Sequence, residues 1–241
     1  MTGTRIKGAL FDKDGTLIDF TATWRGMVED MITEYADGDD ALAGALGAAI
    51  GYDVATGLFL PGSPIVADTT DEVARLLAAL LPGRSADEIE SDANRRAAGI
   101  GAGDLLAPVD GLRGAMERLS AMGISLGVGT HDSEAAARAH ADKIGVADLI
   151  CFYAGYDSGH GLKPGPGMPN AFCEAIDAAP ADVVMVGDSI HDLGAGNSAG
   201  VAASVGVLTG PASEAELAPE ADIVLPSVAD LPDYLRRRFP A

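Results

Sequence analysis

Apolar and polar positions divide this chain into two parts with different patterns. After Pro108, short apolar runs alternate with segments in which apolar residues recur every three or four positions. Short apolar runs between turns are typical of buried strands, and a spacing of three or four is typical of amphipathic helices. These runs, with one more near the start of the chain, predict strands at 6–11, 124–129, 149–153, 183–186, 201–207 and 223–225. The segments between them predict helices at 111–122, 133–145, 168–179, 190–199 and 213–218.

Strands that alternate with helices in this way form a parallel sheet with helices on both faces. The crossovers in such a sheet are right-handed, and ligands bind at the carboxyl ends of the strands. We therefore expect an α/β fold with a doubly wound, Rossmann-like core domain made of residues 1–19 and 108–241.

The block between the first strand and the others, residues 20–107, has a helical pattern throughout and no run typical of a buried strand. Residues 51–68 are rich in turn formers and predict a loop between helices. The motifs at 69–72 (Thr-Thr-Asp-Glu) and 85–88 (Ser-Ala-Asp-Glu) are typical of helix starts. We expect this block to form an α-helical cap domain inserted above the carboxyl edge of the sheet. Helical spacing is clearest at Trp24, Met27, Met31 and Tyr35, and at Val73, Leu76, Leu77, Leu80 and Leu81.

Composition limits the classes of partner. The 241 residues are 48% hydrophobic, enough for a substantial core, and 16 basic side chains face 36 acidic ones, for a net charge of −20. Nucleic acids and anionic membranes need a basic protein face, so we expect neither as a partner. An anionic substrate is compatible with this charge, because a local cation can reverse the field inside one site. No run approaches the ~18 apolar residues of a membrane span.

The start of the chain and its cysteines indicate a reducing compartment. The first residues lack the long apolar segment of a signal peptide, so we expect a cytoplasmic protein. Cys151 and Cys173 lie in apolar surroundings, and neither belongs to a CxxC motif. We expect both to be buried free thiols rather than a disulfide. For the assembly we expect a monomer or a homodimer.

Two carboxylates directly follow the first predicted strand. Asp12 and Asp14 are separated by Lys13, after which Gly15 allows a tight turn and Thr16 supplies a hydroxyl. Like charges repel each other, so a protein places two aspartates together mainly where a cation or a proton transfer needs them. The sequence therefore predicts a reactive site in this loop.

Polar residues also follow three later strands of the predicted sheet. Because the carboxyl ends of parallel strands lie at one edge, side chains from these loops should converge. Phosphoryl transfer needs an in-line nucleophile, neutralisation of charge and a proton donor to the leaving group. A carboxylate can be that nucleophile, Mg²⁺ prefers carboxylate ligands, and a hydroxyl and a lysine can hold phosphate oxygens. The residues expected to converge are Asp12, Asp14, Thr130, Lys163, Asp188 and Asp192.

Four motifs, in the right order, give the sequence a resemblance to the haloacid dehalogenase-like (HAD) hydrolase superfamily. The resemblance covers residues 6–18 and about 109–225, and the helical block looks like the cap of the phosphoglycolate phosphatase-like branch. The motifs are residues 12–16 (Asp-Lys-Asp-Gly-Thr), Thr130 at a strand end, Lys163 followed by Pro164, and residues 187–192 (Gly-Asp-Ser-Ile-His-Asp).

The resemblance implies a role for each reactive carboxylate. Asp12 would attack phosphorus, and Asp14 would protonate the leaving oxygen and then activate water. Asp12, Asp188 and the main-chain carbonyl of Asp14 would bind Mg²⁺. Asp192 would support the metal through water or through a neighbouring ligand.

The same resemblance implies a set of residues that bind the substrate. Thr130 and Lys163 would bind the phosphate, helped by main-chain N–H groups near Lys13 and His131. Thr16 would position Asp14 or the loop. The full set expected to contact or shape the substrate site is Lys13, Gly15, Thr16, Thr130, His131 and Lys163.

Several residues leave two interpretations open. Lys13 stands where the family usually has an apolar residue, and it either attracts the anionic substrate or is a solvated side chain. His131 stands where many relatives have Asn, and it either contacts the leaving group or is a simple loop histidine. On the cap, Arg95 and Arg96 either reach a substrate carboxylate or form a solvated helix face.

We therefore expect a Mg²⁺-dependent phosphatase of small phosphorylated metabolites that acts through an aspartyl-phosphate. Phosphoglycolate is the leading named substrate, by analogy with the family branch alone. One alternative is a phosphomutase of the β-phosphoglucomutase type, which returns the phosphoryl group to a second substrate hydroxyl. The other is a catalytically silent module that binds phosphorylated ligands, although the presence of both Asp12 and Asp14 argues against it.

Overall fold

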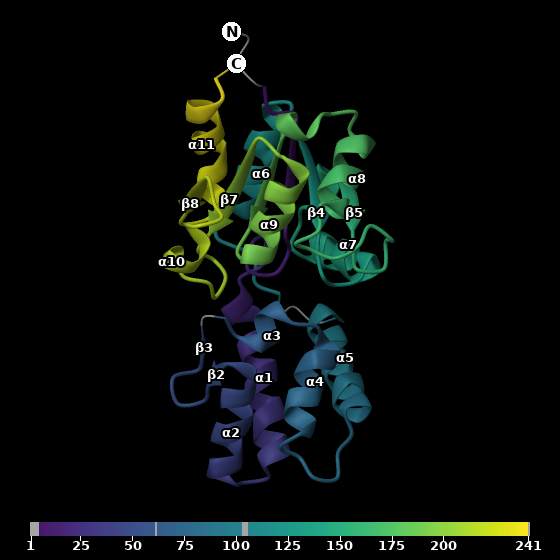
Figure 1. Cartoon of the computed structure of the whole chain (residues 1–241), viewed down its shortest axis with the longest axis vertical. Coiled ribbons are helices and arrows are strands. Elements are labelled where there is room, and N and C mark those ends of the chain that lie inside the picture. Colours follow the sequence, from purple (N-terminus) through teal and green to yellow (C-terminus); the bar gives the residue numbers. More distant parts are fainter. Residues whose placement is uncertain (1–4, 61, 103–105, 241) are drawn as a thin grey trace. The chain divides into compact units, whose positions relative to one another are not determined.

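A computed structural model describes residues 5–60, 62–102 and 106–240. Its contacts divide the chain into two compact units (Figure 1). The first unit is Met1–Asp19 together with Ala107–Ala241, and the second is Phe20–Leu106. Each unit has a hydrophobic core of its own, so each is described separately below.

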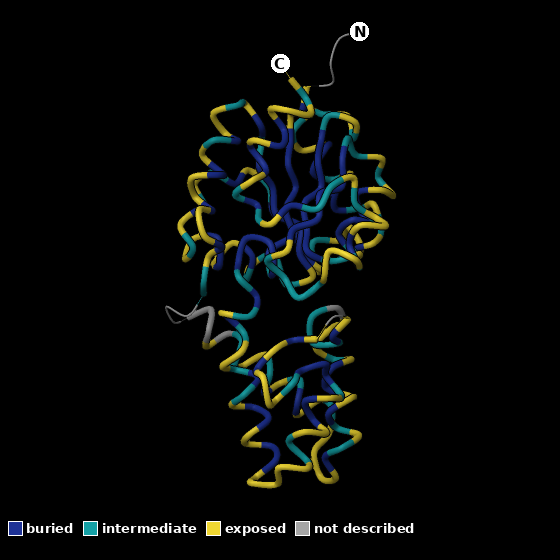
Figure 2. Tube along the Cα trace, turned by 90° about the vertical axis from the view of Figure 1, so that its left-hand side faces the viewer, coloured by how far each residue is buried: buried dark blue, intermediate teal, exposed yellow. Residues whose placement is uncertain are grey.

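A six-stranded sheet forms the centre of the first unit, and most of its residues are buried (Figure 2). The strand order is β5-β4-β1-β6-β7-β8, and every neighbouring pair is parallel, which confirms the predicted α/β fold. β1 lies in the interior of the sheet between β4 and β6 although it comes first in the chain, so its carboxyl end meets the loops of both neighbours. The strands are β1 Gly8–Phe11, β4 Ser125–Gly129, β5 Ile150–Ala154, β6 Val183–Gly187, β7 Ala203–Val207 and β8 Ile223–Leu225.

Helices cover both faces of this sheet. On one face, α6, α7 and α11 pack against the side of β1 that carries Ala9 and Phe11. On the other, Phe172 of α8 packs so closely on Gly8 and Gly127 that a Cβ at either glycine would overlap its ring. α9 packs on this second face too, against β6 and β7. The helices are α6 Leu112–Ala121, α7 Glu134–Lys143, α8 Gly167–Ala175, α9 Ile190–Ala199, α10 Glu214–Leu217 and α11 Leu231–Arg238, with short 3-10 turns at Ala147–Leu149, Pro180–Asp182 and Val228–Asp230.

The second unit is mainly helical, as the sequence predicts. Both predicted helix starts are present, each as a capping box: Thr69 N donates to Glu72 Oε2 at 3.0 Å, and Ser85 N donates to Glu88 Oε2 at 2.8 Å. The apolar residues of the helical pattern form one cluster that includes Met31, Leu46, Leu77 and Ile89. The elements are α1 Phe20–Ala36, α2 Asp40–Ile50, β2 Tyr52–Asp53, β3 Leu58–Phe59, α3 Pro64–Ala67, α4 Thr70–Ala78 and α5 Ala86–Ala102.

The expectation of a plain loop at residues 51–68 is wrong. The segment contains an antiparallel hairpin, in which Tyr52 pairs with Phe59, and the short helix α3. The paired rings lie 5.1 Å apart between centroids, and both side chains are buried in the helical core. Each strand has two residues, too few for an alternating pattern to be visible in the sequence.

The expectation of two buried thiols is half wrong. Cys173 on α8 is buried, and burial raises the pKa of its thiol. Cys151 is exposed, because β5 is an edge strand and this position lies on its less covered side. Within residues 5–60, 62–102 and 106–240, no helix combines the length and apolar character needed to cross a membrane.

Candidate active site

The pairing of β1 with its neighbours brings the predicted loops to one edge of the sheet. Phe11, the last residue of β1, is level with Val186 of β6 and Val128 of β4. Asp12 therefore emerges beside the end of β6, and Asp12 N continues the ladder by donating to Val186 O at 2.9 Å. Asp188 follows β6 in the same way, and the two carboxylates meet.

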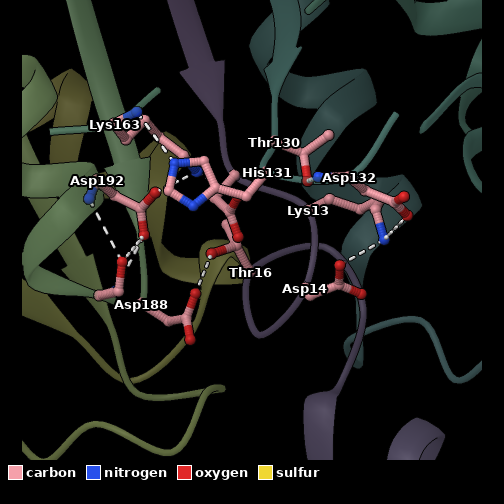
Figure 3. Close-up of polar contacts among 11 residues, drawn as sticks. Lys13, Asp14, Thr16, Thr130, His131, Asp132, Lys163, Asp188 and Asp192 are labelled. Atoms are coloured by element: carbon pink, nitrogen blue, oxygen red, sulfur yellow. Dashed lines mark hydrogen bonds and ion pairs between the residues drawn. The ribbon is translucent and has the colours of Figure 1, made fainter. Parts of the chain in front are cut away.

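Lys163, which follows β5, joins this group from the other side of β1. Its Nζ lies 2.6 Å from Asp12 Oδ1. The same Nζ lies 2.5 Å from Asp192 Oδ1, and both Lys163 and Asp192 are labelled in Figure 3. One carboxylate oxygen from each of Asp12, Asp188 and Asp192 lies within 4.8 Å of the others, and all three residues are buried. Three segments far apart in the sequence, after β1, β5 and β6, thus bring three carboxylates and one ammonium together.

The charges of this cluster do not balance, and the pKa values reflect this. Burial raises the pKa of Asp12 to about 7, and the nearby Asp192 adds to this effect while Lys163 opposes it. Burial also raises the pKa of Asp188 well above its usual range, with Asp12 and Asp192 adding to the shift. Burial alone would lower the pKa of Lys163, but Asp12 and Asp192 outweigh it and raise the pKa above the usual value. The cluster therefore holds more negative charge than Lys163 offsets.

A divalent cation fits this donor set. The donors are carboxylate oxygens, which Mg²⁺ prefers, and a cation would relieve the excess of buried negative charge. The Asp188 carboxylate accepts from Thr16 Oγ1 at 3.2 Å and is cradled by two glycines. A Cβ at Gly15 or at Gly210 would overlap that carboxylate, so glycine at both positions provides the space that the Asp188 side chain occupies.

Asp192 is held more tightly than Asp188. Its Oδ2 accepts from Ser189 N at 3.0 Å and from Ser189 Oγ at 2.6 Å, the capping box that begins α9, while its Oδ1 accepts from Lys163. Both oxygens therefore already have protein partners. Gly187 makes this possible, because a Cβ there would overlap the Asp192 side chain.

The structure also identifies residues that the sequence reasoning missed. Thr209 Oγ1 donates to the main-chain oxygen of Gly15 at 2.6 Å, and Gly210 packs on Asp188. Gly15 has a φ of +81°, a conformation that side chains other than glycine rarely adopt. Thr209 and Gly210 follow β7, the strand next to β6, so the same loop-edge argument could have found them.

His131 holds the Lys163 loop. Its Nε2 accepts a hydrogen bond from Lys163 N at 3.0 Å, a role that neither interpretation of His131 foresaw. Although His131 is among the exposed residues, desolvation of its ring and the Lys163 charge lower its pKa to about 4. The ring is therefore neutral at pH 7 and can accept. Nearby, Thr130 Oγ1 accepts from Asp132 N at 3.1 Å, and the Lys163–Pro164 peptide is cis.

Lys13 is not a solvated side chain, so that interpretation is wrong. Only 2% of Lys13 is exposed, and its Nζ lies 2.5 Å from Asp14 Oδ2 and 3.4 Å from Asp132 Oδ2. Thr16 Oγ1 donates to Asp188 Oδ1 at 3.2 Å (Figure 3). Asp14 is thus paired with Lys13, which also contacts Asp132 in the loop after β4.

The two cap arginines form ion pairs within their own unit. Arg96 pairs with Asp92 at 2.7 Å and with Glu34 at 2.5 Å, and Arg95 also pairs with Asp92. Asp92 is buried and accepts from Tyr35 Oη at 2.8 Å. The solvated-face interpretation is therefore wrong for Arg96, whose side chain is only 21% exposed.

Comparisons with a family model, a curated relative and solved structures agree with the family resemblance of the sequence motifs. A family model described as haloacid dehalogenase-like hydrolase matches residues 6–200. A phosphoglycolate phosphatase from Rhodospirillum rubrum is 32% identical over 201 residues, which are 81% of this chain and 77% of that protein. A HAD family hydrolase from Deinococcus radiodurans, solved with bound phosphate and sodium, has a TM-score of 0.72 at 20% identity, covering 98% of this chain and 97% of its own. A β-phosphoglucomutase from Clostridium difficile has a TM-score of 0.68 at 17% identity, covering 97% of this chain and 96% of its own.

Proposed function

Because the chain belongs to the haloacid dehalogenase-like hydrolase family, we propose that it is a Mg²⁺-dependent phosphatase of small phosphorylated metabolites. The observation that carries this proposal is that the side chains of Asp12, Lys163 and Asp188 lie close together at one edge of the sheet. Phosphoglycolate is the first substrate to test, because a relative named phosphoglycolate phosphatase is 32% identical over most of both chains.

In the first step, an Asp12 carboxylate oxygen attacks phosphorus as the bond from phosphorus to the leaving oxygen breaks. Asp14 donates a proton to that leaving oxygen, so the alcohol departs neutral. Lys163 lies 2.6 Å from Asp12, and its positive charge offsets part of the repulsion between a carboxylate and a phosphoryl anion. The product of this step is an aspartyl-phosphate on Asp12.

In the second step, water attacks the phosphorus of the aspartyl-phosphate and gives a proton to the Asp14 carboxylate. The bond between phosphorus and the Asp12 oxygen breaks, which releases inorganic phosphate and restores the Asp12 carboxylate. Asp14 thus returns to the protonated form in which it began. One residue serves as acid and then as base, as the two-step reaction requires.

The residues that would hold Mg²⁺ are Asp12, Asp188 and the main-chain carbonyl of Asp14, with Asp192 in support. When bound, the ion supplies positive charge that neutralises the phosphoryl oxygens. Thr16 keeps the Asp188 carboxylate in place, and Ser189 keeps that of Asp192. Thr130 and Lys163 complete the proposed phosphate-binding set.

A phosphate-release screen tests this proposal. The wild-type chain and Asp12→Asn are incubated with Mg²⁺ and a panel of phosphorylated metabolites that includes phosphoglycolate. Release of inorganic phosphate by the wild type alone supports a phosphatase. An isomerised sugar phosphate without net release would identify a phosphomutase, and no turnover of any compound would identify a binding module.

A further inference from the structure

A second group of charges lies beside the Asp12 cluster and is defined by Lys13, Asp14 and Asp132. The Lys13 ammonium is 2.5 Å from Asp14 Oδ2 and 3.4 Å from Asp132 Oδ2. Figure 3 shows Lys13 reaching towards both carboxylates, while Lys163 and Asp192 lie together on the other side of the site. The phosphatase mechanism described above uses Asp14 but assigns nothing to Lys13.

Burial makes Lys13 the fixed member of this group. The Lys13 side chain is 2% exposed, whereas those of Asp14 and Asp132 are 24% and 36% exposed. A buried ammonium is tolerated only when it is paired, so its position is set by the protein around it. Burial lowers the pKa of Lys13, but Asp14 and Asp132 outweigh this and raise it, so Lys13 stays charged.

The loop after β4 anchors the other end of the group. Asp132 Oδ1 accepts from Ser133 N at 2.7 Å, and Asp132 O accepts from Tyr156 N at 3.0 Å. Asp132 is thereby held by its own loop, and Lys13 connects that loop to Asp14. Two more titratable groups lie near Lys13. Asp12 adds to the rise in the pKa of Lys13, and His140 of α7 is buried, with no hydrogen-bond partner for its Nδ1 in the described part of the chain.

His140 does not compete for Lys13. Burial lowers the pKa of its ring, and the nearby Lys13 charge lowers it further, so the ring remains neutral. The Lys13 ammonium is therefore shared between two carboxylates, and one of them, Asp132, has a fixed place. Pairing with Lys13 therefore restricts the Asp14 side chain to one side of its turn.

Resting on the phosphatase function proposed above, we propose that Lys13 is a positioning residue that directs the Asp14 carboxylate for proton transfer to the leaving oxygen. A general acid must lie within hydrogen-bond reach of the oxygen that it protonates. Asp14 sits in a glycine-containing turn on a short side chain. Lys13 Nζ donates to Asp14 Oδ2, and a carboxyl oxygen can accept that hydrogen bond in the protonated as well as the ionised form, so the contact limits the directions in which the group can point. Lys13 acts through Asp14 and touches neither phosphorus nor the leaving group.

The test compares two aryl phosphates of similar size whose leaving groups differ in basicity. p-Nitrophenolate is a good leaving group and needs little protonation, whereas phenolate from phenyl phosphate needs more. The value of kcat/KM reports phosphoryl transfer up to the first irreversible step, before the aspartyl-phosphate is hydrolysed. Lys13→Met should lower kcat/KM for phenyl phosphate at least about tenfold more than for p-nitrophenyl phosphate, a fraction of the ~10²–10⁴ that general acid catalysis contributes.

Two further variants support the interpretation. Lys13→Met/Asp132→Asn removes one positive and one negative charge, so the net charge of the cluster is unchanged. This double variant replaces Lys13→Met if the single variant fails to fold, and it should show the same leaving-group dependence. Lys7→Met is the matched control, because Lys7 pairs with Asp182 on the surface and its side chain is 52% exposed. This control should retain the wild-type ratio between the two substrates.

Equal losses of kcat/KM on both esters, or a rise of KM alone on both, would overturn the positioning role of Lys13. That failure is distinct from failure of the phosphatase function. In the latter case the wild type would release no phosphate from either ester, or Asp12→Asn would release as much as the wild type.

Discussion

Gly210→Ala is the substitution that the site geometry predicts most sharply. Gly210 has no positive φ that would exclude alanine, but a Cβ there would overlap Asp188 Oδ2. Real Cβ contacts are at least 3.0 Å, so the Asp188 carboxylate must move by about 1 Å. This movement would disturb the 3.2 Å hydrogen bond that Asp188 accepts from Thr16.

The size of the effect follows from that displacement. A misplacement of about 1 Å in a catalytic group costs about 10²-fold in rate, or about 2.7 kcal/mol of transition-state stabilisation. We expect Gly210→Ala to lower kcat/KM for phosphate release by about this factor. We also expect a higher Mg²⁺ concentration for half-maximal activity, because Asp188 is a proposed ligand.

The assay is phosphate release over a range of Mg²⁺ concentrations, with thermal unfolding measured in parallel. Gly114→Ala is the matched control, because it lies in α6 and nothing lies within 4 Å of an added Cβ. The control should keep full activity and gain about 0.5–1 kcal/mol of stability, as helical Gly→Ala changes do. Wild-type activity and an unchanged Mg²⁺ requirement in Gly210→Ala would refute the reasoning.

Three further predictions concern the same site. EDTA should stop phosphate release, and added Mg²⁺ should restore it; activity that persists after metal removal would contradict the metal assignment. Asp14→Asn should lower turnover by about 10²–10⁴, the range of general acid–base catalysis, and unchanged rates would exclude its proposed role. The lowered pKa of His131, about 4 when folded, means that the unfolded chain binds the extra proton as pH falls from about 6.5 towards 4, so His131 reduces stability across that window. Between pH 7 and pH 5, the melting temperature of the wild type should therefore fall by more than that of His131→Asn. An equal fall in the two proteins would contradict this.

The sequence predicted the core sheet and the convergence of Asp12, Lys163, Asp188 and Asp192 because both follow from local patterns. Strands such as β6 are continuous apolar runs, and Asp188 and Lys163 each follow a strand. Parallel strands bring all such loops to one edge, so convergence needs no knowledge of side-chain packing. The position of β1 between β4 and β6 then places Asp12 among them.

What the sequence could not predict depends on contacts between distant residues. The hairpin at Tyr52 and Phe59 is stabilised by burial in the helical core, which no two-residue strand reveals. The exposure of Cys151 depends on β5 being an edge strand, a property of strand order. The burial of Lys13 depends on Asp132, which is 119 positions away in the chain. The helix α11 was not predicted either.

The most direct test of the account is to look for phosphate on Asp12 itself. The wild type and Asp14→Asn are mixed with an excess of p-nitrophenyl phosphate and Mg²⁺, quenched in acid and digested, and the peptide that contains Asp12 is examined by mass spectrometry. The account predicts a phosphorylated Asp12 in both proteins and none in Asp12→Asn. Continued phosphate release by Asp12→Asn, or turnover by the wild type with no phosphate on Asp12 at any quench time, would contradict it.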